Sequence, residues 1–249
     1  MGEQQLPENY IQKFNEFSES INDKIIECIN LNDNRLTEHL LHIHQKLWNN
    51  YKNLTGTSAG FSGIDEHIVF LAFKYFIENL NDPQKFECKK LRSSRDLCSF
   101  EMENNNKNLI MYRSSKLSHF PDEARNLLFK DGIKLRAPDI AILKKEDDIY
   151  TMIAAIEIKN YLDKSATNSA IGMLSQIRDA SNGNHTKYAL FSFDGIYVGD
   201  ETAKNLKDFQ NYKNNYLIVT EGRSKKRKNM FDVTDLSQFF DSIKKDLEL

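Results

Sequence analysis

Two short segments carry residue types that could hold a divalent cation and act on water. The first is Pro138-Asp139 and the second is Glu157-Ile158-Lys159. If they converge, two carboxylates and one ammonium share one place. Oxygen ligands that leave positions open for water and phosphate suit Mg²⁺ or Mn²⁺ rather than zinc.

The chain between these segments has the pattern of a β-hairpin. Apolar, β-branched runs cover residues 135–143 and 150–158, and a polar run at 144–148 separates them. An antiparallel pair with its turn centred on residue 148 places Asp139 opposite Glu157, because that residue lies midway between them. The hairpin therefore predicts that the two carboxylates face each other.

Strand periodicity predicts which side chains share a face. Glu157 and Lys159 are two residues apart, so they project from one face, while Ile156 and Ile158 pack on the other. Carboxylates placed directly opposite each other repel and destabilise a strand pair. The arrangement makes most sense if a divalent cation neutralises them.

The remaining elements follow from apolar spacing and turn residues. Two amphipathic helices are predicted within residues 8–54, with a break at 30–34. Further helices are predicted at 63–81, 121–129, 165–180 and 236–247, and strands at 86–91, 188–193 and 216–220. This order predicts an α/β fold, a mixed β-sheet flanked by helices. Residues 1–55 are expected to form an N-terminal helical arm for dimerisation or docking, or part of the core, and residues 56–249 the main domain.

The motif Pro138-Asp139 with Glu157-Ile158-Lys159, inside this order of elements, resembles the PD-(D/E)xK nuclease superfamily over roughly residues 63–220. The resemblance implies a restriction-endonuclease-like fold in which Asp139, Glu157 and the carbonyl of Ile158 bind the metal. It also implies that Lys159 orients or activates the attacking water. The metal, Mg²⁺ with Mn²⁺ as a substitute, acts as a Lewis acid and water activator.

Family members often add a glutamate from the helix before the sheet. Glu66, beside the start of the 63–81 helix, matches this better than Glu78 at its far end. Gln176 is expected to contribute near the site. The Tyr that follows it four residues later in exonuclease-type relatives is Ala180 here, which favours an endonuclease.

A basic run after the last predicted strand is a candidate for phosphate contacts, because such contacts position a protein on a duplex. The run contains Arg223, Lys225, Lys226, Arg227 and Lys228. A solvated loop is the equally weighted alternative.

Composition restricts the class of protein. The chain has 249 residues, 40% hydrophobic and 28% charged, with a net charge of −2, which excludes a uniformly basic nucleic-acid coat. The three cysteines, without C-x-x-C spacing, are expected to be reduced, and His39, His42 and His44 are expected to be solvated rather than zinc ligands. Because a basic start and a long apolar run are both missing, a cytoplasmic location without membrane contact is expected.

The sequence thus predicts a metal-dependent endonuclease that hydrolyses DNA phosphodiester bonds, of a restriction or defence type. Two cuts in a duplex need two sites, so a homodimer on double-stranded DNA is expected. Two alternatives remain open: a non-catalytic nucleic-acid-binding or scaffold subunit, and a nuclease that acts on RNA or branched DNA.

Overall fold

A computed structural model of the chain describes residues 8–31, 35–55, 62–81, 85–92, 95–101, 107–113, 127, 129–130, 133–146, 149–180, 185–220 and 231–247. The helices are α1 (Glu8–Leu31), α2 (Leu36–Thr55), α3 (Ser62–Asn81), α5 (Lys164–Ala180), α6 (Asp200–Gln210) and α8 (Leu236–Leu247). The strands are β1 (Lys85–Arg92), β2 (Arg95–Glu101), β3 (Lys107–Arg113), β4 (Phe129–Lys130), β5 (Ile133–Lys134), β6 (Ile140–Glu146), β7 (Ile149–Lys159), β8 (Lys187–Ser192) and β9 (Asn215–Val219).

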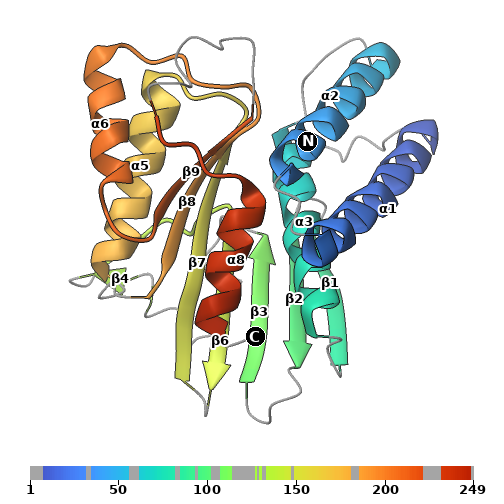
Figure 1. Cartoon of the computed structure of the whole chain (residues 1–249), viewed down its shortest axis with the longest axis horizontal. Coiled ribbons are helices and arrows are strands. Elements are labelled where there is room, and N and C mark those ends of the chain that lie inside the picture. Colours follow the sequence, from blue (N-terminus) through green and yellow to red (C-terminus); the bar gives the residue numbers. More distant parts are fainter. Residues whose placement is uncertain are drawn as a thin grey trace.

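Within the described residues, seven strands form one mixed sheet in the order β1-β2-β3-β6-β7-β8-β9. Neighbours from β1 to β7 run antiparallel, whereas β7, β8 and β9 run parallel to one another. Parallel neighbours need a crossover connection, and α5 and α6 lie in the two crossovers. Figure 1 shows α5 and α6 beside β8 and β9. The α/β class and the mixed sheet flanked by helices are as predicted.

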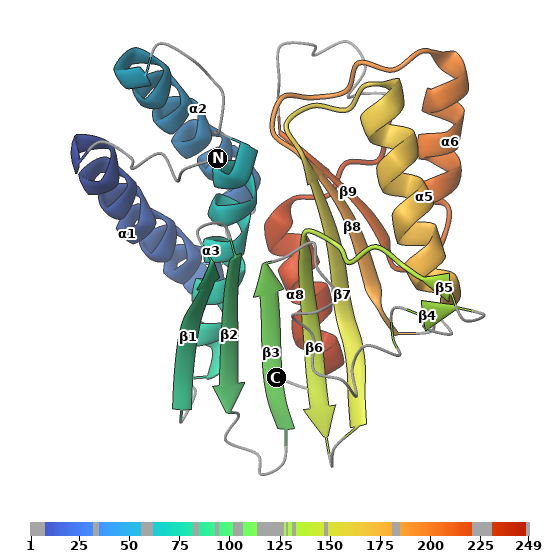
Figure 2. The ribbon, with the colours of Figure 1, turned by 180° about the vertical axis from the view of Figure 1, so that it is seen from behind.

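Each face of the central sheet carries its own apolar core. Ile140 and Ile156 pack with α1, α2, α3 and α8 on one face, and Ala141 and Ala155 pack with α5 and α6 on the other. Figure 2 shows α5 in front of the sheet and α8 behind it. Because both faces are covered, the first four residues of β6 and most of the second half of β7 are apolar. No helix in the described part of the chain combines the length and apolarity needed to cross a membrane.

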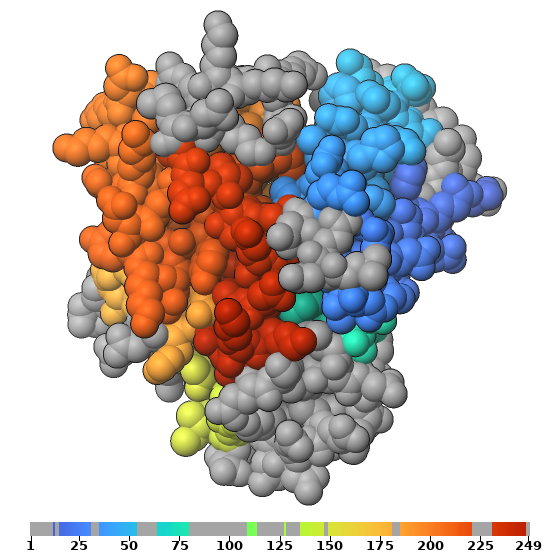
Figure 3. Space-filling view, in the orientation of Figure 1, coloured from blue at the N-terminus to red at the C-terminus, as the bar shows by residue number. Residues whose placement is uncertain are grey.

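The helices α1 and α2 share the core of α3 and α8. The start of α2 is tied to the start of α8, because Thr37 N donates to Asp235 Oδ2 and Leu236 N donates to Thr37 Oγ1, at 3.1 and 2.7 Å. Figure 3 shows the α8 surface (red) between those of α6 (orange) and of α1 and α2 (blue). The helices α1 and α2 therefore contribute to the core, and their role as an arm for dimerisation or docking stays a prediction. Their buried apolar residues include Ile21, Ile25, Leu40, Ile43 and Leu47.

Several predicted elements differ from those of the structure. The strand predicted at 135–143 begins only at Ile140, since Pro138 lacks the N–H that a ladder needs, and it continues through the polar residues to Glu146. The helix predicted at 121–129 lies mostly outside the described residues, and Phe129 belongs to β4. The elements β2, β3 and α6 were not predicted from the sequence. The buried face of α6 consists of only Thr202, Ala203, Leu206 and Phe209, so its sequence shows a weak apolar periodicity from which to predict a helix.

Candidate active site

The β6–β7 hairpin brings the two predicted carboxylates together. Ile140, the first residue of β6, pairs with Ile156. The same register, continued to the residue before β6, places Asp139 opposite Glu157. This confirms the predicted pairing. A bulge between Ile142 and Leu143 absorbs one residue of β7, so the ladder closes on Glu146 and Ile149 rather than around a turn centred on residue 148.

The Asp139 carboxylate is held by the main chain of the neighbouring strand. Its Oδ2 accepts a hydrogen bond of 2.8 Å from the amide of Ile158, and the side chain is buried. Because β6 begins only at Ile140, this carboxylate accepts the hydrogen bond that a backbone carbonyl of the ladder would otherwise accept. The bond fixes the orientation of Asp139 at the edge of the ladder.

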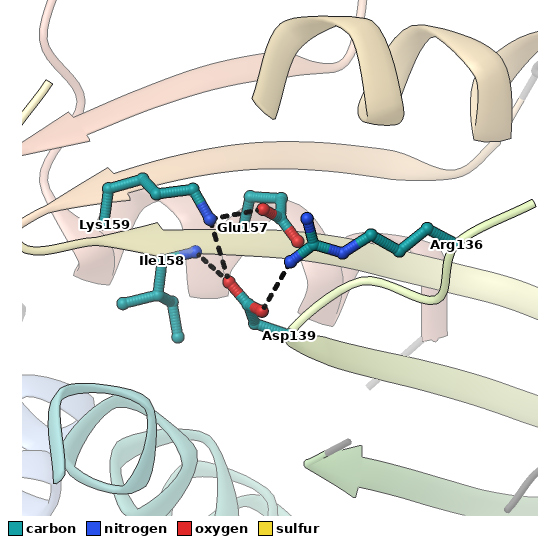
Figure 4. Close-up of polar contacts among 5 residues, drawn as sticks. All are labelled: Arg136, Asp139, Glu157, Ile158 and Lys159. Atoms are coloured by element: carbon teal, nitrogen blue, oxygen red, sulfur yellow. Dashed lines mark hydrogen bonds and ion pairs between the residues drawn. The ribbon is translucent and has the colours of Figure 1, made fainter. Parts of the chain in front are cut away.

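Glu157 and Lys159 form the other half of the site, as Figure 4 shows. The Lys159 Nζ lies 2.6 Å from Glu157 Oε2 and 3.5 Å from Asp139 Oδ2. Glu157 is only 1% exposed, and its Oε1 has no hydrogen-bond partner among the described residues. Ile156 and Ile158 lie in the core on the opposite face, as predicted.

The charges that are shielded from solvent in this cluster do not balance, because the guanidinium of Arg136 beside Asp139 is half exposed. Burial and the charge of Asp139 raise the pKa of Glu157 above its ordinary value. Burial lowers the pKa of Lys159, but the charges of Asp139 and Glu157 outweigh this effect, and the pKa lies above its ordinary value. One ammonium thus faces two buried carboxylates, and an added cation would be stabilised there.

Glu66 lies in the first turns of α3 within electrostatic range of the hairpin. Burial and the charge of Asp139 raise its pKa to about 7, against the opposite effects of Arg113 and Lys159. Glu78, the weaker candidate, is twelve residues further along α3, or about 18 Å along the helix axis, and it pairs with Lys74 at 3.5 Å. The preference for Glu66 therefore agrees with its position.

The donor set fits a hard divalent ion in part. Two buried carboxylates and an oxygen without a hydrogen bond suit Mg²⁺ or Mn²⁺. Across the described ranges, however, no three His, Cys, Asp or Glu side chains lie close enough to ligate one ion. Glu66 therefore influences the pair through its charge in this conformation. The contact recorded for Ile158 is made by its amide, and the role of its carbonyl stays a prediction.

Most of the predicted nucleic-acid contacts fall on residues that the structure does not describe, so they stay a prediction. Residues 221–230 lie outside the described residues, and they include Arg223, Lys225, Lys226, Arg227 and Lys228. Gln176 is exposed on α5, twelve residues after the start of that helix at Lys164. Gln176 therefore lies about 18 Å along the helix axis from the first residue of α5.

Two arginines of the site were not predicted from the sequence. Arg113, buried at the end of β3, pairs with Ile140 in the ladder and lowers the pKa of Glu66 by its charge. Arg136 approaches Asp139, with Nη2 3.9 Å from Oδ1. Only Arg136 could have been found from the sequence, because it stands three residues before Asp139 in the chain. Arg113 reaches the site through strand pairing.

The expectation of solvated histidines is wrong for His44. This side chain is buried, its Nε2 lies 2.8 Å from Asp65 Oδ1, and its ring stacks on Phe193 with centroids 4.3 Å apart. The reason is helical spacing, since His44 lies on the apolar stripe of α2 with Leu40 and Leu47. The pair connects α2 to the start of α3, next to Glu66.

We expect His44→Ala to destabilise the protein by about 3 kcal/mol, because it leaves the buried Asp65 carboxylate without its partner. Urea unfolding of wild type and variant measures this difference. His42→Ala is the control: His42 is exposed on the same helix, so its replacement should change stability by less than about 0.5 kcal/mol. Equal stability of the two variants would contradict a structural role of the pair.

Among solved structures, the chain is similar to a restriction endonuclease, PspGI, in complex with its substrate DNA. The identity is 14%, the alignment covers 93% of each chain, and the TM-score is 0.30. No protein-family model matches the chain, and no curated protein matches it. A likeness of this size carries no argument about activity, so function has to be argued from the site itself.

Proposed function

We propose that the chain is a Mg²⁺-dependent endonuclease that hydrolyses phosphodiester bonds of double-stranded DNA, of a restriction or defence type. The observation that carries the proposal is the buried pair Asp139 and Glu157, which shares a single ammonium and keeps an oxygen without a hydrogen bond among the described residues. Of the two cations described beside the pair, Lys159 bonds to Glu157 and Arg136 stays half exposed at 3.9 Å from Asp139, so a divalent cation would be stabilised between the two buried carboxylates. It also lies on the residues that resemble the PD-(D/E)xK motif.

The four polar or main-chain contacts at the open end of the hairpin each have a role in this proposal. Asp139 and Glu157 hold Mg²⁺, or Mn²⁺ in its place, and such an ion supplies Lewis-acid stabilisation of charge on the phosphate when bound. The Ile158 amide keeps the Asp139 carboxylate aimed at the site. Lys159 uses one contact on Glu157, and its remaining N–H donors orient or activate the attacking water.

Cleavage of both strands of a duplex requires two sites, so the proposal includes a homodimer whose two-fold symmetry matches that of the duplex. The N-terminal helices are the candidate interface suggested by the sequence, and α1 exposes Ile26. Deletion of residues 1–55 is a poor test of that role, because it removes Ile21, Ile25 and other core residues. A charged substitution at Ile26 leaves the core intact.

The test is incubation of purified protein with supercoiled plasmid in the presence of Mg²⁺, Mn²⁺ or a chelator. We expect wild type to nick or linearise the plasmid with either metal and to leave it intact in chelator. Asp139→Ala should show no cleavage. Asp208→Ala, which removes an exposed aspartate of α6, should cleave like wild type.

The result also separates the alternatives. An intact plasmid under every condition would contradict cleavage of DNA by this chain alone, and RNA and branched DNA would then be tested in the same assay. Metal-independent cleavage, or equal cleavage by Asp139→Ala, would contradict the assigned site. Binding of nucleic acid without cleavage of any substrate would favour the non-catalytic subunit.

A further inference from the structure

The segment before Asp139 places one cation at the exposed side of the carboxylate pair. Leu135 and Ala137 are buried against the α5 and α6 side of the sheet, whereas Arg136 between them is exposed. Its side chain is 51% exposed, compared with 5% for Asp139.

The two cations beside Asp139 differ in how far they are engaged. Lys159 is mostly buried and makes a short contact with Glu157. The guanidinium of Arg136 lies 3.9 Å from Asp139 Oδ1, which is longer than a hydrogen bond. Figure 4 shows it approaching Asp139 from the side opposite Lys159. Arg136 is thus attracted to the site while its N–H donors keep no hydrogen bond with Asp139.

We propose that Arg136 binds the substrate phosphate at the two carboxylates, an inference that rests on the proposed nuclease function. A phosphate approaching Asp139 and Glu157 meets like charge, so a cation at the exposed side has to offset the repulsion. A guanidinium suits this task, because its planar donors contact two phosphate oxygens at once. Lys159 already donates to Glu157, and the proposed function assigns its remaining donors to the attacking water.

This role differs from that of a simple counter-ion for Asp139. A counter-ion affects how the carboxylate binds metal, whereas a phosphate ligand affects binding of nucleic acid and the rate of cleavage. The two roles of Arg136 therefore predict different effects of its replacement: a counter-ion changes metal affinity, whereas a phosphate ligand changes DNA binding and cleavage.

The experiment compares wild type, Arg136→Gln, Arg136→Lys and the control Lys164→Gln. Lys164 is a 73% exposed cation at the start of α5 that pairs with Glu201. Binding of a fluorescent DNA duplex is measured in Ca²⁺ by anisotropy at salt concentrations from about 50 to about 200 mM. Cleavage of the same duplex is measured with Mg²⁺ under single-turnover conditions, and Mn²⁺ affinity by calorimetry.

We expect Arg136→Gln to slow cleavage by about 10²-fold, as loss of one fixed donor to a reacting group does. It should also reduce the slope of log affinity against log salt by about 0.9, the value for one phosphate contact. Arg136→Lys should keep that slope but remain slow, because an ammonium keeps the charge without the two-point contact. Lys164→Gln should cleave at the wild-type rate.

Wild-type cleavage and an unchanged salt slope in Arg136→Gln would overturn the inference and leave the nuclease proposal standing. A slower rate with an unchanged slope and altered Mn²⁺ affinity would also overturn it, since Arg136 would then act on Asp139. If wild type cleaves no DNA, the nuclease proposal fails separately. The salt slope still decides whether Arg136 contacts phosphate.

Discussion

Lys159→Ala should reduce single-turnover DNA cleavage by about 10³-fold or more, while binding of the duplex in Ca²⁺ changes little. Removal of a positioned proton donor or acceptor costs about 10² to 10⁴ in rate. Lys159 is the one cation in hydrogen-bond contact with Glu157 in the described site. Its loss also leaves the two carboxylates without the ammonium between them, so the variant should be less stable in chelator than in Mg²⁺.

Lys187→Ala provides the matched control. Lys187 is a buried lysine of the central sheet, paired with Asp246 at 3.0 Å, and it lies on β8 opposite Ala154. It is therefore five residues, or about 16 Å, from the level of Lys159 along the strands. We expect this variant to lose stability but to cleave at the wild-type rate while folded. Equal loss of cleavage in both variants would show that the effect is structural.

Glu157→Gln should abolish metal-dependent cleavage and yet leave the metal-free protein at pH 8 at least as stable as wild type. The glutamine keeps the shape of the side chain and removes a buried charge whose pKa is raised by burial and by Asp139. The variant should therefore lose the stabilisation by Mn²⁺. Wild type at saturating metal should gain about 3 kcal/mol, the value at roughly a hundred times the dissociation constant.

The pH dependence follows from the same shifts. An acid whose pKa is raised in the folded state holds its proton where the unfolded chain has already lost it, so stability falls as pH rises between the two values. For Glu66 this window extends from 4.5 to about 7, and Glu157 shifts in the same direction. Wild type in chelator should therefore melt at a lower temperature at pH 8 than at pH 5. Mn²⁺ should offset the loss most strongly at pH 8.

Glu78→Gln is the control for this measurement. Burial also raises the pKa of Glu78, but this carboxylate pairs with Lys74 away from the hairpin. The variant should keep the wild-type melting shift with Mn²⁺. Persistence of that shift in Glu157→Gln, or its absence in wild type, would contradict the assignment of Glu157 as a metal ligand.

The local pattern of the sequence was sufficient to predict the hairpin and its polar residues. The alternation that separates Glu157 and Lys159 from Ile156 and Ile158 is a property of any strand, so it required no tertiary information. The turn position followed from the polar run at 144–148, and it was displaced only by the bulge between Ile142 and Leu143. Helices with broad apolar stripes, such as α8, were located for the same reason.

Only the tertiary structure decided what surrounds this hairpin. Arg113 and Glu66 come close to Asp139 because β3 and α3 pack beside β6 and β7, and no spacing along the chain encodes that approach. The burial of His44 and the core position of α1 and α2 likewise depend on contacts between distant segments. Periodicity shows that a face is apolar, but the partner of that face is selected by packing of the whole chain.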